Sequence, residues 1–81
     1  MNENEKIAQA LLMVLQEGEE LINTYGLDDS CLPVERFGYW KRQSKIEFDI
    51  GLFEMQDLGN IRYWLDKIKE HIRESDNNFV K

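Results

Sequence analysis

Two stretches of this chain, residues 3–25 and 57–75, place apolar side chains every three or four residues. This spacing puts the side chains on one face of a helix, so it predicts two amphipathic α-helices. Asn2 or Asn4 is a suitable cap for the first helix, and Gly26 stands where a left-handed residue would end it. The first row holds Ile7, Leu11, Val14, Gly18, Leu21, Ile22 and Tyr25, and the second holds Leu58, Ile61, Leu65, Ile68 and Ile72.

Gly18 lies in the apolar row of the first predicted helix. A glycine in a helix interior costs up to ~1 kcal/mol relative to alanine. We therefore expect another element to pack closely against the helix backbone at this position.

A short alternating pattern follows in the middle of the chain. Its apolar members are Ile46, Phe48, Ile50 and Leu52. A period of two is typical of a half-buried strand. Residues 36–42 are aromatic and compatible with a strand, so residues 36–42 and 45–52 are predicted to pair as a hairpin. Residues 27–35, which include Pro33, are predicted to form a connection.

The predicted fold is therefore α+β in the order α-β-β-α, with two helices packed on an antiparallel hairpin or small sheet. The alternative is an all-α fold in which Pro33 begins a helix over residues 33–43. The alternation after Lys45 argues against extending that helix further. A chain of 81 residues fits one domain, residues 1–81.

Cys31 is the only cysteine, so an internal disulfide framework is excluded. A lone cysteine favours a reducing, cytoplasmic setting. The acidic start of the chain differs from a secretory signal, and no apolar stretch approaches the ~18 residues that cross a bilayer. We expect a cytoplasmic protein without a membrane partner.

The residues offer no catalytic, metal or cofactor pattern. One cysteine and one histidine leave few catalytic combinations, and Cys31 and His71 are expected to be ordinary loop and helix side chains. The acids between residues 47 and 57 lack the spacing of a calcium loop. We predict that the protein is not an enzyme and holds no cofactor or metal.

The first candidate binding surface is the basic aromatic segment 36–45, in a chain of formal charge −6. The register of the predicted hairpin decides whether Trp40 is exposed, and so whether this segment can bind a partner. In one register Trp40 faces solvent among cations, which suits a protein partner or an unpaired base. In the other register Trp40 is buried against Phe48. The candidate residues are Arg36, Trp40, Lys41, Arg42 and Lys45.

The second candidate surface is formed by Leu12 and Met13, which lie off the buried row of the first helix, beside Gln9 and Gln16. Scattered apolar side chains are ordinary on a protein surface, and the alternative is that these two belong to a self-association or partner surface.

These features predict a small acidic protein-binding module, of the kind that inhibits or regulates a partner by occupying its surface. Phage and mobile-element accessory proteins share its size and acidity, which is an association and not a motif. Candidate partners are another protein and a second copy bound through the first helix. Mimicry of nucleic acid by surface carboxylates is a further hypothesis. The alternative function is a nucleic-acid-binding domain that uses the basic aromatic hairpin 36–45.

Overall fold

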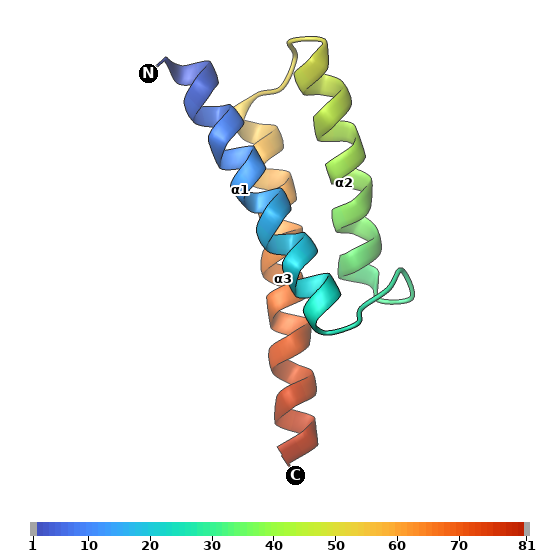
Figure 1. Ribbon diagram of the computed structural model, residues 1–81. Helices are drawn as coiled ribbons and strands as arrows, with labels where there is room; N and C mark the ends of the chain where they lie inside the picture. The colour runs from blue at the N-terminus through green and yellow to red at the C-terminus, as the bar shows by residue number, and fades with distance from the viewer. Residues whose placement is uncertain (1, 81) are drawn as a thin grey trace.

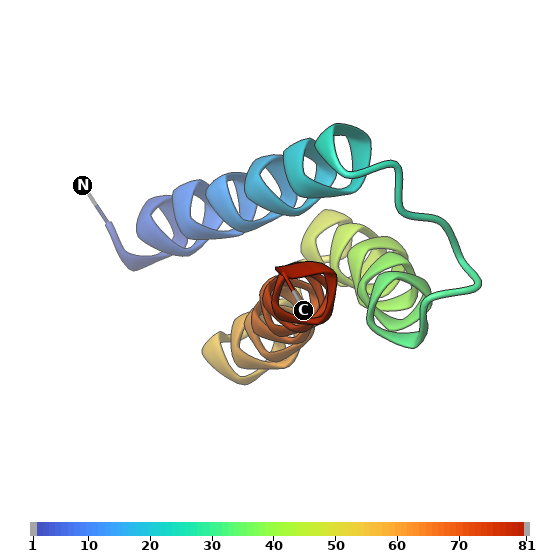
Figure 2. The same cartoon turned by 90° about the horizontal axis from the view of Figure 1, so that it is seen from below.

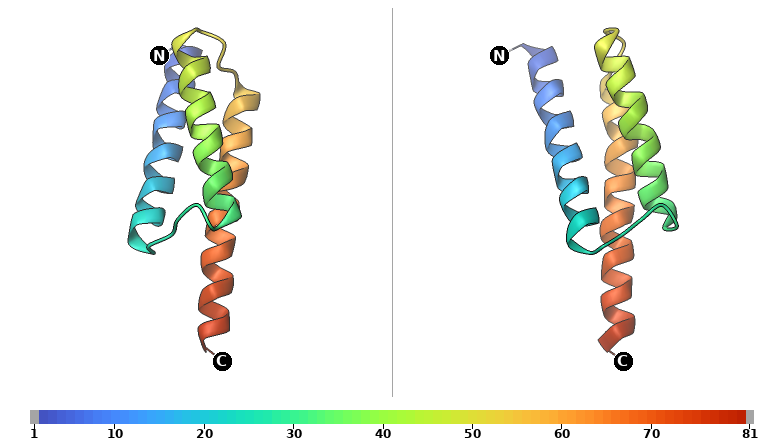
Figure 3. Two further views of the ribbon diagram at one scale, coloured as in Figure 1. Left: turned by 90° about the vertical axis from the view of Figure 1, so that its right-hand side faces the viewer. Right: turned by 45° about the vertical axis from the view of Figure 1, so that its right-hand side comes forward.

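The structure, a computed structural model, describes the backbone of residues 2–80 and the side chains of residues 2–75. It contains three helices, α1 (Glu3–Thr24), α2 (Leu32–Asp49) and α3 (Met55–Val80). The chain runs down α1, up α2 and down α3, and the last turns of α3 extend past the connection between α1 and α2 (Figures 1 and 3). Seen from below, the three helices surround a common interior (Figure 2). Within the described residues, no helix combines the length and the apolar character needed to cross a membrane.

The predicted α+β fold is wrong, because residues 2–80 contain no strand and the predicted hairpin is a single helix, α2. The all-α alternative is nearer to the structure. Pro33 lies in the first turn of α2, where its missing N–H needs no intrahelical partner. The helix then continues beyond Lys45, where the alternating pattern argued that it should stop.

The core-facing row of α2 explains why its helical period was missed. Val34, Phe37 and Ser44 are buried on one face, and Lys41 and Phe48 continue that row at helical spacing. Two of these five positions are polar, which hides the helical pattern. The apolar residues that gave the period of two are 41–64% exposed, and they are Ile46, Phe48, Ile50 and Leu52.

Helix α1 begins and ends as its sequence predicts. The backbone N–H of Glu5 donates to Asn2 Oδ1 at 2.8 Å, so Asn2 is the cap. Gly26 has a φ of 62°, and the N–H of Leu27 returns to the carbonyl of Ile22 at 2.9 Å. This left-handed glycine and its returning hydrogen bond close the helix.

The connection between α2 and α3 uses similar local chemistry. Gly51 has a φ of 77°, and the N–H of Leu52 donates to the carbonyl of Glu47 at 2.8 Å. At the start of α3, the N–H of Glu54 donates to the carboxylate of Asp57 at 2.9 Å. Helix α3 begins at Met55, two residues earlier than predicted, so Asp57 is its third residue. From this position its carboxylate caps the backbone N–H that precedes the helix.

Apolar residues from all three helices form one core. The buried rows of both predicted helices are confirmed at their central positions, whereas Tyr25 is half exposed. The core residues are Leu11, Val14, Leu15, Val34, Phe37, Leu58, Ile61, Leu65 and Ile68.

The close approach predicted at Gly18 is confirmed. The ring of Phe37 from α2 lies directly against the Gly18 backbone, where a Cβ would come within 2.6 and 2.8 Å of Cε2 and Cε1 and closer still to Cζ. Phe37 itself is 1% exposed. The glycine is therefore required by the packing of α2 on α1.

Acidic side chains on both sides of Gly18 tie α1 to the other two helices. Glu17 pairs with Lys69 of α3 at 2.6 Å, and Glu19 pairs with Lys41 of α2. Exposed pairs of this kind contribute roughly 0–1 kcal/mol each. The helices are held together around residues 17–19, while α1 and α2 diverge toward the start of α1 (Figure 1).

Candidate functional site

The divergence of α1 from α2 leaves an apolar depression on the surface, made of two adjoining hollows that share Phe48. One hollow, of about 210 Å³, is lined by Ala8, Leu11, Leu12, Leu15 and Phe48. The other, of about 170 Å³, is lined by Asn4, Ile7, Phe48, Gly51 and Phe53. We call this surface, with all of these lining residues, the α1–α2 groove.

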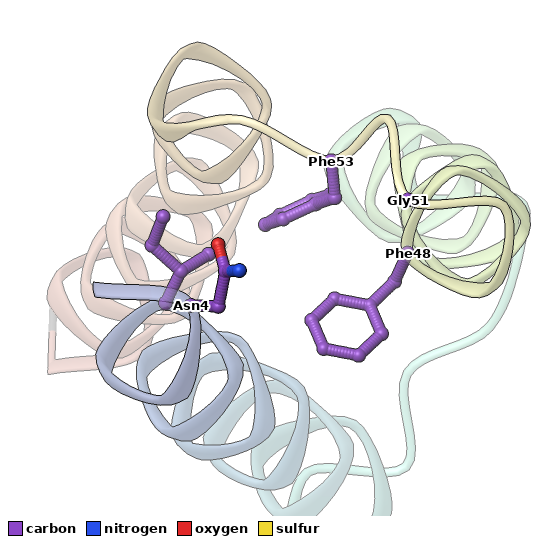
Figure 4. Close-up of a pocket in the computed structure, with 5 residues that line it drawn as sticks. Asn4, Phe48, Gly51 and Phe53 are labelled. Carbon is purple, nitrogen blue, oxygen red and sulfur yellow. The ribbon is translucent and has the colours of Figure 1, made fainter. Parts of the chain in front are cut away.

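Phe48 and Phe53 shape the open end of the α1–α2 groove. Figure 4 shows both rings pointing into the space beside Asn4 of α1. Their centroids are 6.1 Å apart, with the rings tilted by 57°. Phe48 is nevertheless 41% exposed, so its ring offers a large apolar surface to solvent.

Glu19 and Lys41 pair beyond the other end of the α1–α2 groove, one turn of α1 after Leu15. The hydrogen bond from Lys41 lowers the pKa of Glu19, and the positive charge of the nearby Lys45 acts in the same direction. The carboxylate therefore stays ionised at neutral pH, with basic side chains of α2 facing α1 across this end.

Leu12 and Met13, predicted as one surface, are both exposed, at 55% and 68%, but they lie on different sides of α1. Leu12 lines the α1–α2 groove. Met13 lines a separate hollow between α1 and α3, beside Glu17 and Arg62. Successive helical residues are 100° apart, which separates the two side chains.

The basic aromatic segment does not form the predicted patch. Trp40 is half-buried and packs against the core, so neither of the two predicted hairpin registers describes its position. Its ring is nearly perpendicular to that of Tyr39, with the ring centroids 5.3 Å apart. Arg36 and Lys45 are nine residues apart on α2, which places them on opposite sides of the helix. Lys41, Arg42 and Lys45 remain on neighbouring helical positions, and Lys41 is already paired with Glu19.

Most of the α1–α2 groove was missed by sequence reasoning. Only Leu12 was a candidate, and Phe48 was assigned to the buried face of a strand. Phe48 lies four residues after Ser44 and seven after Lys41, a spacing that would have placed it on one face of a helix with them. Ala8 and Leu15 lie on the flank of the predicted buried row of α1, and no local pattern says that α2 diverges there.

The acids near the turn between α2 and α3 act on one another. A hydrogen bond with Asp57 raises the pKa of Glu47, and the negative charges of Asp57 and Glu54 raise it further. In the part of the chain that the structure describes, no three metal-ligating side chains come together in a possible metal site. Because Asp57 and Glu54 raise the pKa of Glu47, these three acids repel one another at neutral pH.

We expect Glu47→Gln to raise Tm at pH 7 relative to the wild type. A raised folded-state pKa stabilises the fold only at low pH, and this contribution is lost as pH rises through the folded pKa. The gain from the substitution should therefore disappear below the ordinary carboxyl pKa of 4.5. Thermal unfolding followed by circular dichroism, at pH 7 and below pH 4.5, measures the difference in Tm between the variant and the wild type.

Glu20→Gln is the matched control, because Glu20 is exposed on α1 and its removal changes the net charge equally. A gain at pH 7 that is no larger for Glu47→Gln than for this control would contradict repulsion within the cluster.

Cys31 and His71 are not part of the α1–α2 groove. Cys31 is a free, half-buried thiol at the position before α2, and His71 is half-buried on α3. The expectation that neither is catalytic stays a prediction.

Comparison of the chain with protein-family models, with curated proteins and with solved structures found no match.

Proposed function

We propose that this chain is a non-enzymatic protein-binding module that acts by occupying a surface of its partner, with the α1–α2 groove as the docking site for a helix of that partner. The observation that carries the proposal is the open apolar surface around Leu12 and Phe48. An amphipathic helix laid into a hydrophobic groove is a common recognition mode. A small accessory protein that binds in this way can inhibit or regulate a larger one.

The exposure of these side chains supports the proposal over a purely structural role. Leu12 and Phe48 lie beside the core but keep about half of their surface in solvent. Isolated exposed apolar side chains are ordinary, but apolar side chains that line a concave surface are typical of an interface. The proposal places the module in a reducing, cytoplasmic compartment, consistent with the free thiol of Cys31.

Capture from a native lysate with three immobilised proteins tests this function. These are the wild type, Leu12→Glu and Met13→Glu. The two substitutions add the same charge to neighbouring exposed positions of α1, but only Leu12 lines the α1–α2 groove. We expect at least one protein to be captured by the wild type and by Met13→Glu and lost with Leu12→Glu, because a charge in an apolar interface must be desolvated.

Circular dichroism establishes that both variants keep their helices. If Leu12→Glu captures the same proteins as the wild type, or if the wild type captures none, the proposed function is wrong.

A further inference from the structure

We propose that the occupant of the α1–α2 groove is an amphipathic helix with acidic residues along the flank that lies against α2. This inference rests on the proposed function and specifies the chemistry of the partner. The local charge beside the groove, and not the net charge of the chain, selects that helix.

The shape of the α1–α2 groove fits one helix. Its lining on α1 runs from Asn4 to Leu15. At 1.5 Å per residue this is about 16 Å, or three helical turns. Phe48 lies where the two hollows meet, so apolar residues at spacings of three, four and seven on an incoming helix would cover it.

The two sides of the groove differ in charge. On α2, Lys45 follows Lys41 by one turn, and Arg42 lies next to this row. Arg42 and Lys45 are exposed, and neither forms an ion pair with the side chains of residues 2–75. Two acids lie on the same side of α2: Asp49 is one turn beyond Lys45, and Glu35, two turns before Arg42, is paired with Arg36. We call Lys41, Arg42, Lys45 and Asp49 the α2 rim.

The opposite side, on α1, carries Glu5, Gln9 and Gln16, all exposed. It offers no positive charge to an acidic flank. An incoming helix with acids on one side therefore gains ion pairs only when those acids face the α2 rim. The charges of the groove thus set both the composition and the direction of the bound helix.

A second copy of this chain is a poorer occupant. In a second copy the apolar row of α1 is already buried in that copy's own core, so α1 cannot lay this row into the groove of another copy. Helix α1 contains five acidic residues and one basic residue, and each whole chain has a formal charge of −6. Like charges across an interface oppose association.

Two synthetic helical peptides of about 18 residues test the inference. Both carry leucine on one face, and they differ only on one flank, which is glutamate in the first peptide and lysine in the second. Net charge alone predicts tighter binding of the lysine peptide. The α2 rim predicts the reverse, with the glutamate peptide bound about three- to ten-fold more tightly at low salt and the preference reduced by added salt.

Charge reversal on the α2 rim should switch the preference. In the double variant Arg42→Glu, Lys45→Glu we expect the lysine peptide to bind more tightly. The matched control is Arg36→Glu, Arg73→Glu, which makes the same change in net charge at exposed positions outside the groove. The control should keep the preference for glutamate. Fluorescence anisotropy of labelled peptides gives each Kd.

Three results would overturn the inference: no binding of either peptide, an equal or greater affinity for the lysine peptide, or a preference that the control abolishes as fully as the rim variant does. Sedimentation of the chain alone adds a fourth, because a dimer that Leu12→Glu dissociates would make a second copy the occupant. A dimer of this kind would contradict the acidic occupant but would leave the groove as a docking site for a helix. Lysate capture that Leu12→Glu does not affect would instead contradict the proposed function.

Discussion

Gly18→Ala is expected to lower the free energy of unfolding by about 2 kcal/mol. The added Cβ would lie within 2.8 Å of several ring atoms of Phe37, which is 1% exposed and has no free space to enter. Overpacking costs roughly 1–3 kcal/mol, and three ring atoms in such close contact place this substitution at the upper end. A net loss of about 2 kcal/mol then remains after the gain of up to ~1 kcal/mol in helix propensity. At about 4–8 °C per kcal/mol in a domain of this size, Tm should fall by about 10 °C.

Gly59→Ala is the matched control, since Gly59 is exposed on α3 and a Cβ there meets no atom within 4 Å. It should stabilise the protein by up to ~1 kcal/mol. Urea unfolding followed by tryptophan fluorescence measures both variants. Equal stabilisation by Gly18→Ala and Gly59→Ala would show that the ring of Phe37 does not rest on Gly18.

A double-mutant cycle with Phe37→Leu assigns the effect to this contact. The shorter side chain makes room for the new methyl group, so Gly18→Ala should cost less in the Phe37→Leu background than in the wild type. An unchanged cost would place the strain elsewhere.

Ser44→Ala is expected to stabilise the protein by about 1–2 kcal/mol, which corresponds to a rise in Tm of about 4–16 °C. Ser44 is 1% exposed in the core-facing row of α2, and its hydroxyl has no hydrogen-bond partner among the described residues. Burying an unpaired hydroxyl costs free energy, and alanine also has the higher helix propensity.

Ser75→Ala separates the two contributions, because Ser75 is exposed on α3 and gains helix propensity alone. The same urea unfolding applies to both variants. If Ser44→Ala is neutral or destabilising, the buried hydroxyl contributes a hydrogen bond that favours the folded state.

A helix of this protein is predictable from sequence when nearly all of its core-facing positions are apolar. In α1 and α3 nearly every core-facing position is apolar, so their period and the caps at Asn2 and Gly26 were legible. In α2, Lys41 and Ser44 occupy the same row as Phe37. Their polarity broke the helical pattern, and four exposed apolar residues after Lys45 supplied a false period of two.

The candidate surfaces were less predictable than the helices. Helical spacing already places Leu12 and Met13 on different sides of the predicted first helix, and it separates Arg36 from Lys45 once α2 is known to be a helix. Predicting the α1–α2 groove also requires the relative placement of α1 and α2, because the groove exists only where these two helices diverge. That divergence depends on the contact of Gly18 with Phe37 and on where the turn around Gly51 places Phe48 and Phe53.

The amino-acid sequence alone indicated two amphipathic helices, both ends of α1, a net acidic charge and a close contact at Gly18. These are local consequences of side-chain spacing, capping chemistry and backbone conformation. The helical state of the middle segment, and the surface that Leu12 and Phe48 share, follow from the packing of the three helices. The reason is that burial overrides local pattern: α2 is helical because Val34, Phe37 and the half-buried Trp40 face a core that α1 and α3 complete.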